Sequence, residues 1–159
     1  MLEKGDIIYR NNLVFADNGK LDLKIGGHPT LNITDDVNGF TYFFLITSSR
    51  ISGSKETPRR YYKLEKDKAN ALNKRSWVDL SYVFKEETVN KIPSGYVGEK
   101  TFNDIIVSFL YALQEDNIEY DDEQLKNIEE VLELIDYNAV AKATKDNKRN
   151  ILKLIQEKT

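Results

Sequence analysis

The stretch GFTYFFLITSSR, residues Gly39–Arg50, determines the fold that this sequence predicts. Six of the seven residues in Phe40–Ile46 are apolar or aromatic, and an Asn-Gly turn signal precedes them. A short apolar run bounded in this way indicates a strand that is buried on both faces. We therefore expect a central β-strand over Phe40–Ile46, with the hydroxyl groups of Thr47 and Ser48 at its end.

The sequence on either side of this strand is also typical of short β-strands. Turn signals at Asp17-Asn18-Gly19 and at Gly26-Gly27 interrupt the first part of the chain. Several short strands joined by turns predict a small, strongly bent sheet or a partly open barrel. Further strands are expected at Asp6–Phe15, Leu21–Ile25, Thr30–Ile33, Tyr61–Leu64 and Trp77–Phe84, the last alternating so that one face carries Val78, Leu80, Tyr82 and Phe84.

The second half of the chain has the apolar spacing of amphipathic helices. The first helix is expected to begin with a capping box formed by Thr101 and Asp104. A second helix is expected over about Asp122–Asp136 and a third near Lys145–Glu157. Strands followed by helices indicate an α+β fold, and residues 1–159 have the length of a single domain. Expected inward-facing residues are Phe102, Ile105, Ile106, Phe109, Leu110 and Leu113 in the first helix, and Leu125, Ile128, Val131, Leu132 and Ile135 in the second.

The composition excludes several kinds of site. The chain has no cysteine and one histidine, so a disulfide framework is impossible and a zinc site is not expected. No metal or cofactor is predicted, although the many carboxylates leave a hard-cation site open. Met1–Gly5 lacks the features of a signal peptide, and no apolar run is long enough to span a bilayer, which predicts a cytoplasmic protein without membrane partners.

Charge is distributed unevenly along the chain, although the net charge is only −3. Residues 48–75 contain nine lysines and arginines against three acids, whereas residues 114–136 contain ten acids and one lysine. A basic surface of this kind attracts polyanions such as nucleic acids. The pattern also fits a solvated basic loop and an acidic helix face, and the sequence leaves both interpretations open.

The single histidine and a pair of hydroxyl groups form the most informative constellation. His28 lies in GGHPTLNI (Gly26–Ile33), and Thr47, Ser48 and Arg50 close the predicted central strand. Hydroxyl groups and a guanidinium hold phosphate, and an imidazole with a pKa near ~6.5 can exchange protons with ribose oxygens. Cleavage of RNA through its 2′-hydroxyl requires a base, an acid and positive charge. The residues alone also allow His28 to be an ordinary turn residue.

Other chemistries have less support in the sequence. No G-x-S-x-G nucleophile motif is present, and Gly26-Gly27 is followed by neither Gly-Lys-Ser/Thr nor a predicted helix. Asp35-Asp36 and Asp121-Asp122 occur where turns and helix starts favour aspartate, so these pairs do not indicate a two-metal nuclease.

The order of KGDIIY, GGHPTLNI, YFFLITSSR and SWVDLSYVFK resembles the MazF/PemK-like toxin fold, a compact SH3-like antiparallel barrel with packed helices. Over roughly the first hundred residues, the chain is more similar to the type III toxin–antitoxin endoribonucleases of the ToxN, AbiQ and CptN kind. LITSSR resembles that family's Thr-Ser-x-Lys/Arg motif, which implies that Thr47, Ser48 and Arg50 are catalytic. His28 stands where the ToxN branch carries a catalytic lysine, which implies a general base or acid, although histidine for lysine departs from the pattern.

The resemblance implies a metal-independent endoribonuclease that produces a 2′,3′-cyclic phosphate and a 5′-hydroxyl. It also implies inhibition by a repeat RNA that the enzyme processes, within a toxin–RNA assembly. Two alternatives stay open: a toxin inhibited by a protein antitoxin, and a non-catalytic RNA-binding module. Trp77, on an alternating strand, is expected in the core. The residues expected to contact RNA are Lys55, Arg59, Arg60, Tyr62 and Lys63.

Overall fold

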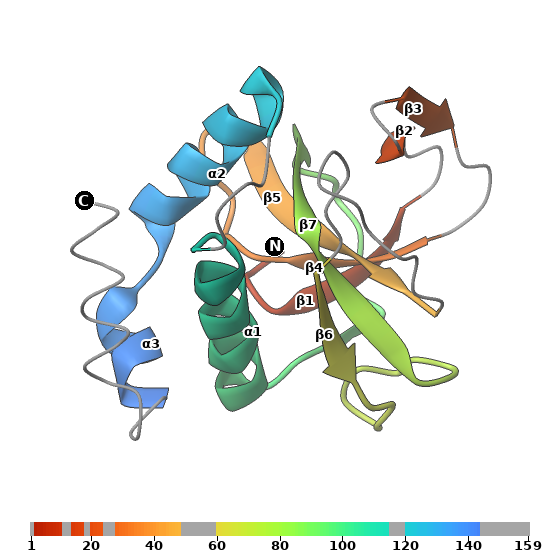
Figure 1. The fold of residues 1–159 in the computed structure, drawn as a ribbon. Coiled ribbons are helices and arrows are strands. Elements are labelled where there is room, and N and C mark those ends of the chain that lie inside the picture. The colour runs from red at the N-terminus through yellow and green to blue at the C-terminus, as the bar shows by residue number, and fades with distance from the viewer. Residues whose placement is uncertain are drawn as a thin grey trace.

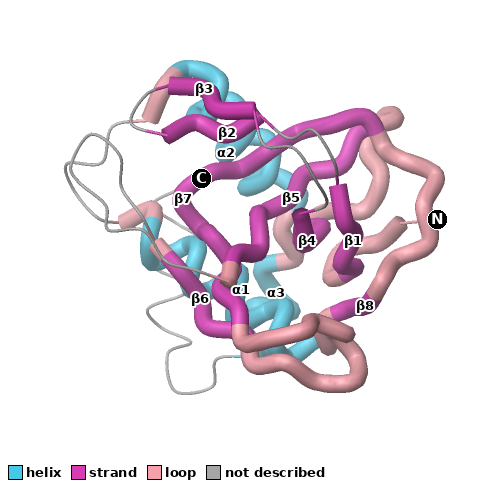
Figure 2. The backbone as a smooth tube through the Cα atoms, turned by 90° about the vertical axis from the view of Figure 1, so that its right-hand side faces the viewer, coloured by secondary structure: helices cyan, strands magenta, loops and turns pink. Residues whose placement is uncertain are grey.

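The computed structural model describes residues 2–10, 14–17, 20–23, 28–48, 60–114 and 120–143, and these residues form an α+β fold (Figure 1). Six antiparallel strands form one sheet in the order β6-β7-β5-β4-β1-β8, curled into a half-barrel (Figure 2). These strands are β1 (Asp6–Arg10), β4 (His28–Asn32), β5 (Phe40–Thr47), β6 (Tyr61–Leu64), β7 (Ser76–Glu87) and β8 (Gly95–Tyr96), and the helices are α1 (Glu99–Ala112), α2 (Asp122–Leu134) and α3 (Tyr137–Ala143).

The predicted central strand is confirmed. β5 pairs with β4 on one side and with β7 on the other, and every residue from 41 to 46 is buried. On the helix side of the sheet, Phe44 packs edge-to-face on Phe109 of α1, with ring centroids 5.1 Å apart. The main hydrophobic core therefore lies between the sheet and the helices, which gather on one side of it (Figure 1).

The predicted single strand Asp6–Phe15 is wrong, because the structure divides it between two sheets. β1 ends at Arg10, where its partner strand β4 begins with His28. β2 (Val14–Asp17) instead pairs with β3 (Lys20–Leu23) in a separate two-stranded hairpin. In the sequence, the Asp17-Asn18-Gly19 turn signal falls at the junction of these two paired strands, so local pairing outweighs continuation of β1.

A bulge in β7 makes the expected alternation wrong for Tyr82 and Phe84. Phe43 of β5 lies opposite Phe84, but two residues further along β5, Leu45 lies opposite Asp79. The register therefore shifts by three residues, and an odd shift exchanges the two faces of the strand. Phe84 packs on Phe43 away from the main core, with centroids 5.5 Å apart.

Side chains of α2 replace the strand hydrogen bonds that the bulge removes. Gln124 accepts a hydrogen bond from the Val83 amide through Oε1 (2.8 Å) and donates one to the Val83 carbonyl through Nε2 (3.0 Å). Asn127 Nδ2 donates to the same carbonyl at 2.9 Å. Buried backbone groups require partners, so this contact couples α2 to β7.

The apolar stripe predicted for the first helix is confirmed, but its capping box is not. α1 begins at Glu99, with Gly98 at the N-cap and no side-chain cap, so Thr101 is already inside the helix. The Val97 amide donates to the Gly5 carbonyl (2.9 Å), which ties the chain entering α1 to the start of β1. Tertiary contact therefore determines where this helix begins.

The second predicted helix agrees with α2, whose N-cap Asp121 accepts a hydrogen bond from the Gln124 amide at 2.8 Å. Ile128 and Val131 are buried as expected, but Leu125 is 44% exposed. The third predicted helix, near Lys145–Glu157, lies outside the described residues, and α3 was not predicted. No helix in the described part of the chain combines the length and the apolar character needed to cross a membrane.

Candidate active site

The sheet has a second face, turned away from the helices, which we call the site face (Figure 2). The side chain of Arg10 identifies it through three contacts. Its Nε donates to Thr30 Oγ1 (3.2 Å), its Nη2 donates to Asn32 Oδ1 (3.4 Å), and its guanidinium carbon lies 4.1 Å from the centroid of the Phe43 ring. Residues two positions away on the same strand, and residues directly opposite on a neighbouring strand, point to the same face.

His28 belongs to the site face because it lies directly opposite Arg10 in the β1–β4 ladder. It is half-buried, and its ring Nδ1 is 3.1 Å from the carbonyl oxygen of Pro29. A carbonyl oxygen only accepts hydrogen bonds, so Nδ1 carries the hydrogen in this contact. In the neutral ring Nε2 is then the basic nitrogen, as a general base requires.

Thr47 lies at the same end of the sheet as His28. The β4–β5 ladder places Thr30 opposite Leu45. His28 lies two residues before Thr30 on β4, and Thr47 lies two residues after Leu45 on β5. Both side chains therefore lie on the site face, on neighbouring strands. Thr47 is half-buried and Ser48, just after the strand, is exposed. The structure therefore brings together residues that are far apart in the sequence.

The row that contains Arg10, His28 and Thr47 continues across β7 and β6. Thr47 lies opposite Trp77 of β7, and Trp77 lies opposite Lys63 of β6. At the usual strand spacing of ~4.8 Å, five strands extend over about 19 Å. We call this set of residues the site row, and it consists of Arg10, His28, Thr47, Trp77 and Lys63.

The expectation that Trp77 is a core residue is wrong. Trp77 is half-buried and belongs to neither hydrophobic cluster of the described residues. At this end of β7, the core side is occupied by the buried residues Val78 and Leu80. The three-residue register shift therefore leaves the indole on the site face, beside Thr47.

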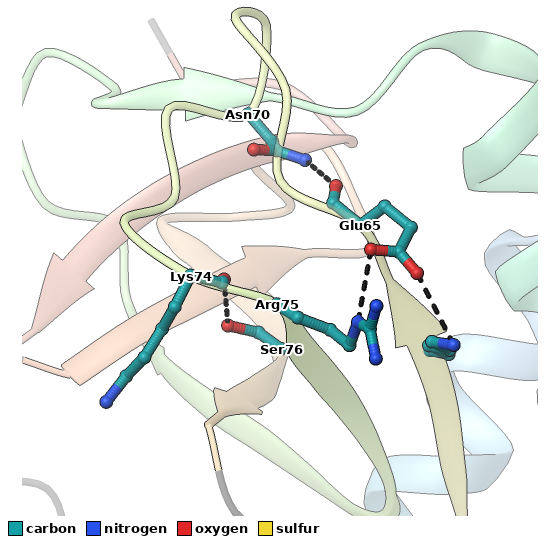
Figure 3. Close-up of polar contacts among 6 residues, drawn as sticks. Glu65, Asn70, Lys74, Arg75 and Ser76 are labelled. Carbon is teal, nitrogen blue, oxygen red and sulfur yellow. Dashed lines mark hydrogen bonds and ion pairs between the residues drawn. The ribbon is translucent and has the colours of Figure 1, made fainter.

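Lys63 is paired with the Glu65 carboxylate at the edge of the sheet, and Figure 3 shows Arg75 on the same carboxylate. Its Nζ lies 3.4 Å from Glu65 Oε1, and Arg75 Nε lies 3.2 Å from Glu65 Oε2. Desolvation raises the pKa of Glu65, but the hydrogen bonds and charges of Arg75 and Lys63 together outweigh it, so the pKa is lowered overall. Lys74 extends away from these contacts in Figure 3. Part of the positive charge in this basic stretch is therefore neutralised internally.

Tyr62 does not join the site row. Its ring packs against the main core on the other face, and it lines a pocket of about 240 Å³ beside the first turn of α1. Burial, followed by the Asp104 carboxylate, raises the pKa of Tyr62. Arg60 is half-buried just before β6, and its amide donates to Ser81 Oγ at 2.7 Å. The predicted site residues Arg50, Lys55 and Arg59 lie outside the described residues.

Two residues of the site face, Arg10 and Asp79, are not predicted from the sequence. Asp79 is 7% exposed, lies opposite both Leu45 and Tyr61, and accepts a hydrogen bond from the Ser81 amide at 2.9 Å. The available signal for Asp79 was its spacing of two from Trp77, which places both on one face of a strand. No group of three or more histidine, aspartate or glutamate side chains within the described ranges forms a set of metal ligands.

Comparison of the sequence with protein-family models and with curated proteins gave no match. The function must therefore be inferred from the geometry of the site face and from the motif resemblance.

Proposed function

We propose that this protein is an endoribonuclease that cleaves RNA by attack of a ribose 2′-hydroxyl on the adjacent phosphate. The observation that carries the proposal is the convergence of His28 and Thr47 at one end of two neighbouring strands. A base, a hydroxyl donor, an aromatic ring and cations in one row form the set of groups that this reaction and its substrate require.

In the proposed reaction, Nε2 of neutral His28 accepts the proton of the 2′-hydroxyl. The 2′ oxygen then forms a bond to phosphorus as the bond to the 5′ oxygen breaks. The leaving 5′ oxygen takes up a proton from solvent, and the His28 imidazolium returns the proton it accepted to solvent. The products are a 2′,3′-cyclic phosphate and a 5′-hydroxyl. Thr47 and Ser48 donate hydrogen bonds to the phosphate oxygens, and Arg50 stabilises the charge that develops on them. The role of Arg50 follows from the motif resemblance.

The rest of the site row supports binding of a single strand. A half-buried tryptophan on a sheet surface can stack on an unpaired base, and lysine and arginine side chains follow the phosphates. In this proposal Trp77 stacks on a base near the cleaved bond, and Lys63 contacts phosphate at the sheet edge. Lys55, Arg59, Arg60 and Tyr62 remain proposed RNA contacts, with Tyr62 reached from the opposite side of β6.

We further propose that the half-barrel is a variant of the MazF/PemK-like fold and that the protein is a cytoplasmic type III toxin. Its inhibitor would then be a repeat RNA that it cleaves and holds in a closed assembly. The support is the order of the four motifs together with the curled antiparallel sheet. A gel shift with repeat RNA separates this proposal from inhibition by a small acidic protein.

The test is incubation of synthetic single-stranded RNAs with protein that has been purified under denaturing conditions and refolded, which removes any bound inhibitor. In excess EDTA, wild type should cleave and leave 2′,3′-cyclic phosphate ends. His28→Ala should lower the rate by about 10²-fold or more, the usual effect of lost acid–base catalysis. Lys100→Ala, on the exposed side of α1, is the control. RNA that is bound but left intact by wild type would favour a non-catalytic RNA-binding module instead.

A further inference from the structure

Arg10 is a buried cation surrounded by neutral groups. Its side chain is 6% exposed, and its Nη2 reaches Thr41 Oγ1 at 3.5 Å in addition to Asn32 Oδ1 at 3.4 Å. These distances are long for hydrogen bonds from a guanidinium, which are usually shorter when the acceptor is charged. The strand residues that surround the guanidinium therefore provide oxygen atoms but no negative charge.

Among the carboxylates whose side chains the structure describes, none forms an ion pair with Arg10. Burial lowers the pKa of the guanidinium, and the carboxylate of Glu86, an exposed residue on β7, acts in the opposite direction. An arginine nevertheless stays protonated at neutral pH. A buried charge without a counter-ion is costly, so an arginine at this position indicates a site that can take an anion.

Asn32 provides a second, independent observation that points to a ligand site. Its side chain is 0% exposed, and its Nδ2 has no hydrogen-bond acceptor in the described part of the chain. The same amide accepts from Arg10 through Oδ1, so the unused donor lies directly beside the guanidinium. A buried water would satisfy the amide but would leave the charge uncompensated. An anionic oxygen satisfies both.

We propose that Arg10 and Asn32 form a phosphate-binding site for the RNA strand, next to the position of the cleaved bond. Thr30 and Asn32 lie two and four residues along β4 from His28, which corresponds to about 7 and 13 Å of extended strand. The guanidinium is hydrogen-bonded to Thr30 and Asn32, further along β4 than His28, so in this proposal it holds a neighbouring phosphate. The identity of the ligand rests on the proposed function, and the presence of an anion site rests on the cluster alone.

The anion site is tested without RNA. The melting temperature of wild type is measured in inorganic phosphate and in chloride at equal ionic strength, together with Asn32→Asp, Arg10→Met and the control Arg75→Met, which removes an exposed arginine. Phosphate should raise the melting temperature of wild type and Arg75→Met but not of the other two variants. Asn32→Asp places a carboxylate beside the Arg10 guanidinium, so this variant should melt higher than wild type in chloride. An equal phosphate effect in all four proteins, or none in wild type, would refute the site.

The source of the phosphate is tested with an intact RNA that wild type cleaves, and with the 2′-methoxy form of the same RNA, which binds but cannot react. Arg10→Met and Asn32→Asp should raise KM about tenfold or more, as expected for lost hydrogen bonds to a charged group, and leave kcat within a few-fold. The slope of log affinity against log salt should fall by about 0.7 for one lost phosphate contact. A phosphate-dependent melting temperature with unchanged KM and salt slope would assign the site to free phosphate and overturn the RNA assignment.

The two proposals fail separately. If wild type cleaves no RNA, the endoribonuclease proposal is wrong, while the melting experiment still decides the anion site. If wild type cleaves RNA and the Arg10 and Asn32 variants match it in melting, KM and salt slope, only the phosphate site is wrong.

Discussion

Gln124→Ala should remove much of the contact that joins α2 to the bulge in β7. In the native protein the Gln124 amide satisfies both the N–H and the C=O of Val83, a residue that is 0% exposed. After truncation the carbonyl keeps Asn127 as its donor, but the N–H loses the partner that the structure shows. An unsatisfied buried donor costs about 1–3 kcal/mol, and the lost second bond adds about 0.5–1 kcal/mol. We expect a loss of about 2–3 kcal/mol in the free energy of unfolding.

Asn127→Ala is the matched comparison. It removes one of two donors to the same carbonyl and leaves no buried group without a partner, so it should cost about 0.5–1.5 kcal/mol. Glu129→Ala, an exposed substitution on the same helix, should be close to neutral.

Urea unfolding of the three variants, followed by far-ultraviolet circular dichroism and tryptophan fluorescence, measures these differences. The slope of free energy against urea should stay constant, because the exposed surface changes little. If Asn127→Ala were as destabilising as Gln124→Ala, the cost would come from helix packing and the assignment to the Val83 amide would be wrong.

Three further predictions address glycine packing, the sheet edge and the titration of Tyr62. Gly95→Ala should destabilise the protein by about 2–3 kcal/mol, because a Cβ at this position would lie 2.4 Å from the Asn70 carbonyl oxygen, whereas Gly98→Ala meets open space and should change the unfolding midpoint little. Glu65→Gln should strengthen binding of a single-stranded RNA by a few-fold at low salt, because it releases Lys63 and Arg75 from weak, exposed ion pairs. The gain should vanish at high salt, and its persistence there would exclude a charge effect. Tyr62 should ionise above the ordinary pKa of tyrosine in an ultraviolet titration, since burial and the Asp104 carboxylate both raise its pKa. Its contribution to stability is therefore complete below the pKa of the unfolded chain and is lost as the pH rises through the folded value, and Tyr62→Phe should remove that part of the alkaline loss.

The motifs predicted part of the candidate site and missed the rest for a physical reason. His28 and Thr47 were identified because an imidazole can exchange protons with ribose oxygens and a hydroxyl can donate to phosphate, and because the order of the motifs resembles a known family. Nothing in the local sequence distinguishes Arg10, because it ends a short apolar strand as many surface arginines do. Only the ladder between β1 and β4 brings it onto the site face, where burial makes its charge significant.

The sequence by itself determined the central strand, the apolar stripe of α1 and the α+β class, because burial selects apolar residues at the period of each element. Only the tertiary structure decided which residues of β7 accompany that strand on each face. If β5 and β7 kept the register that pairs Phe43 with Phe84, Leu80 would lie opposite Thr47. The three-residue shift at the bulge places Trp77 opposite Thr47 instead. Side chains on a strand alternate with a period of two, so an odd register shift exchanges its two faces. The local sequence of β7 does not show where such a shift occurs, because the shift depends on α2, a distant segment whose Gln124 satisfies the unpaired backbone of Val83.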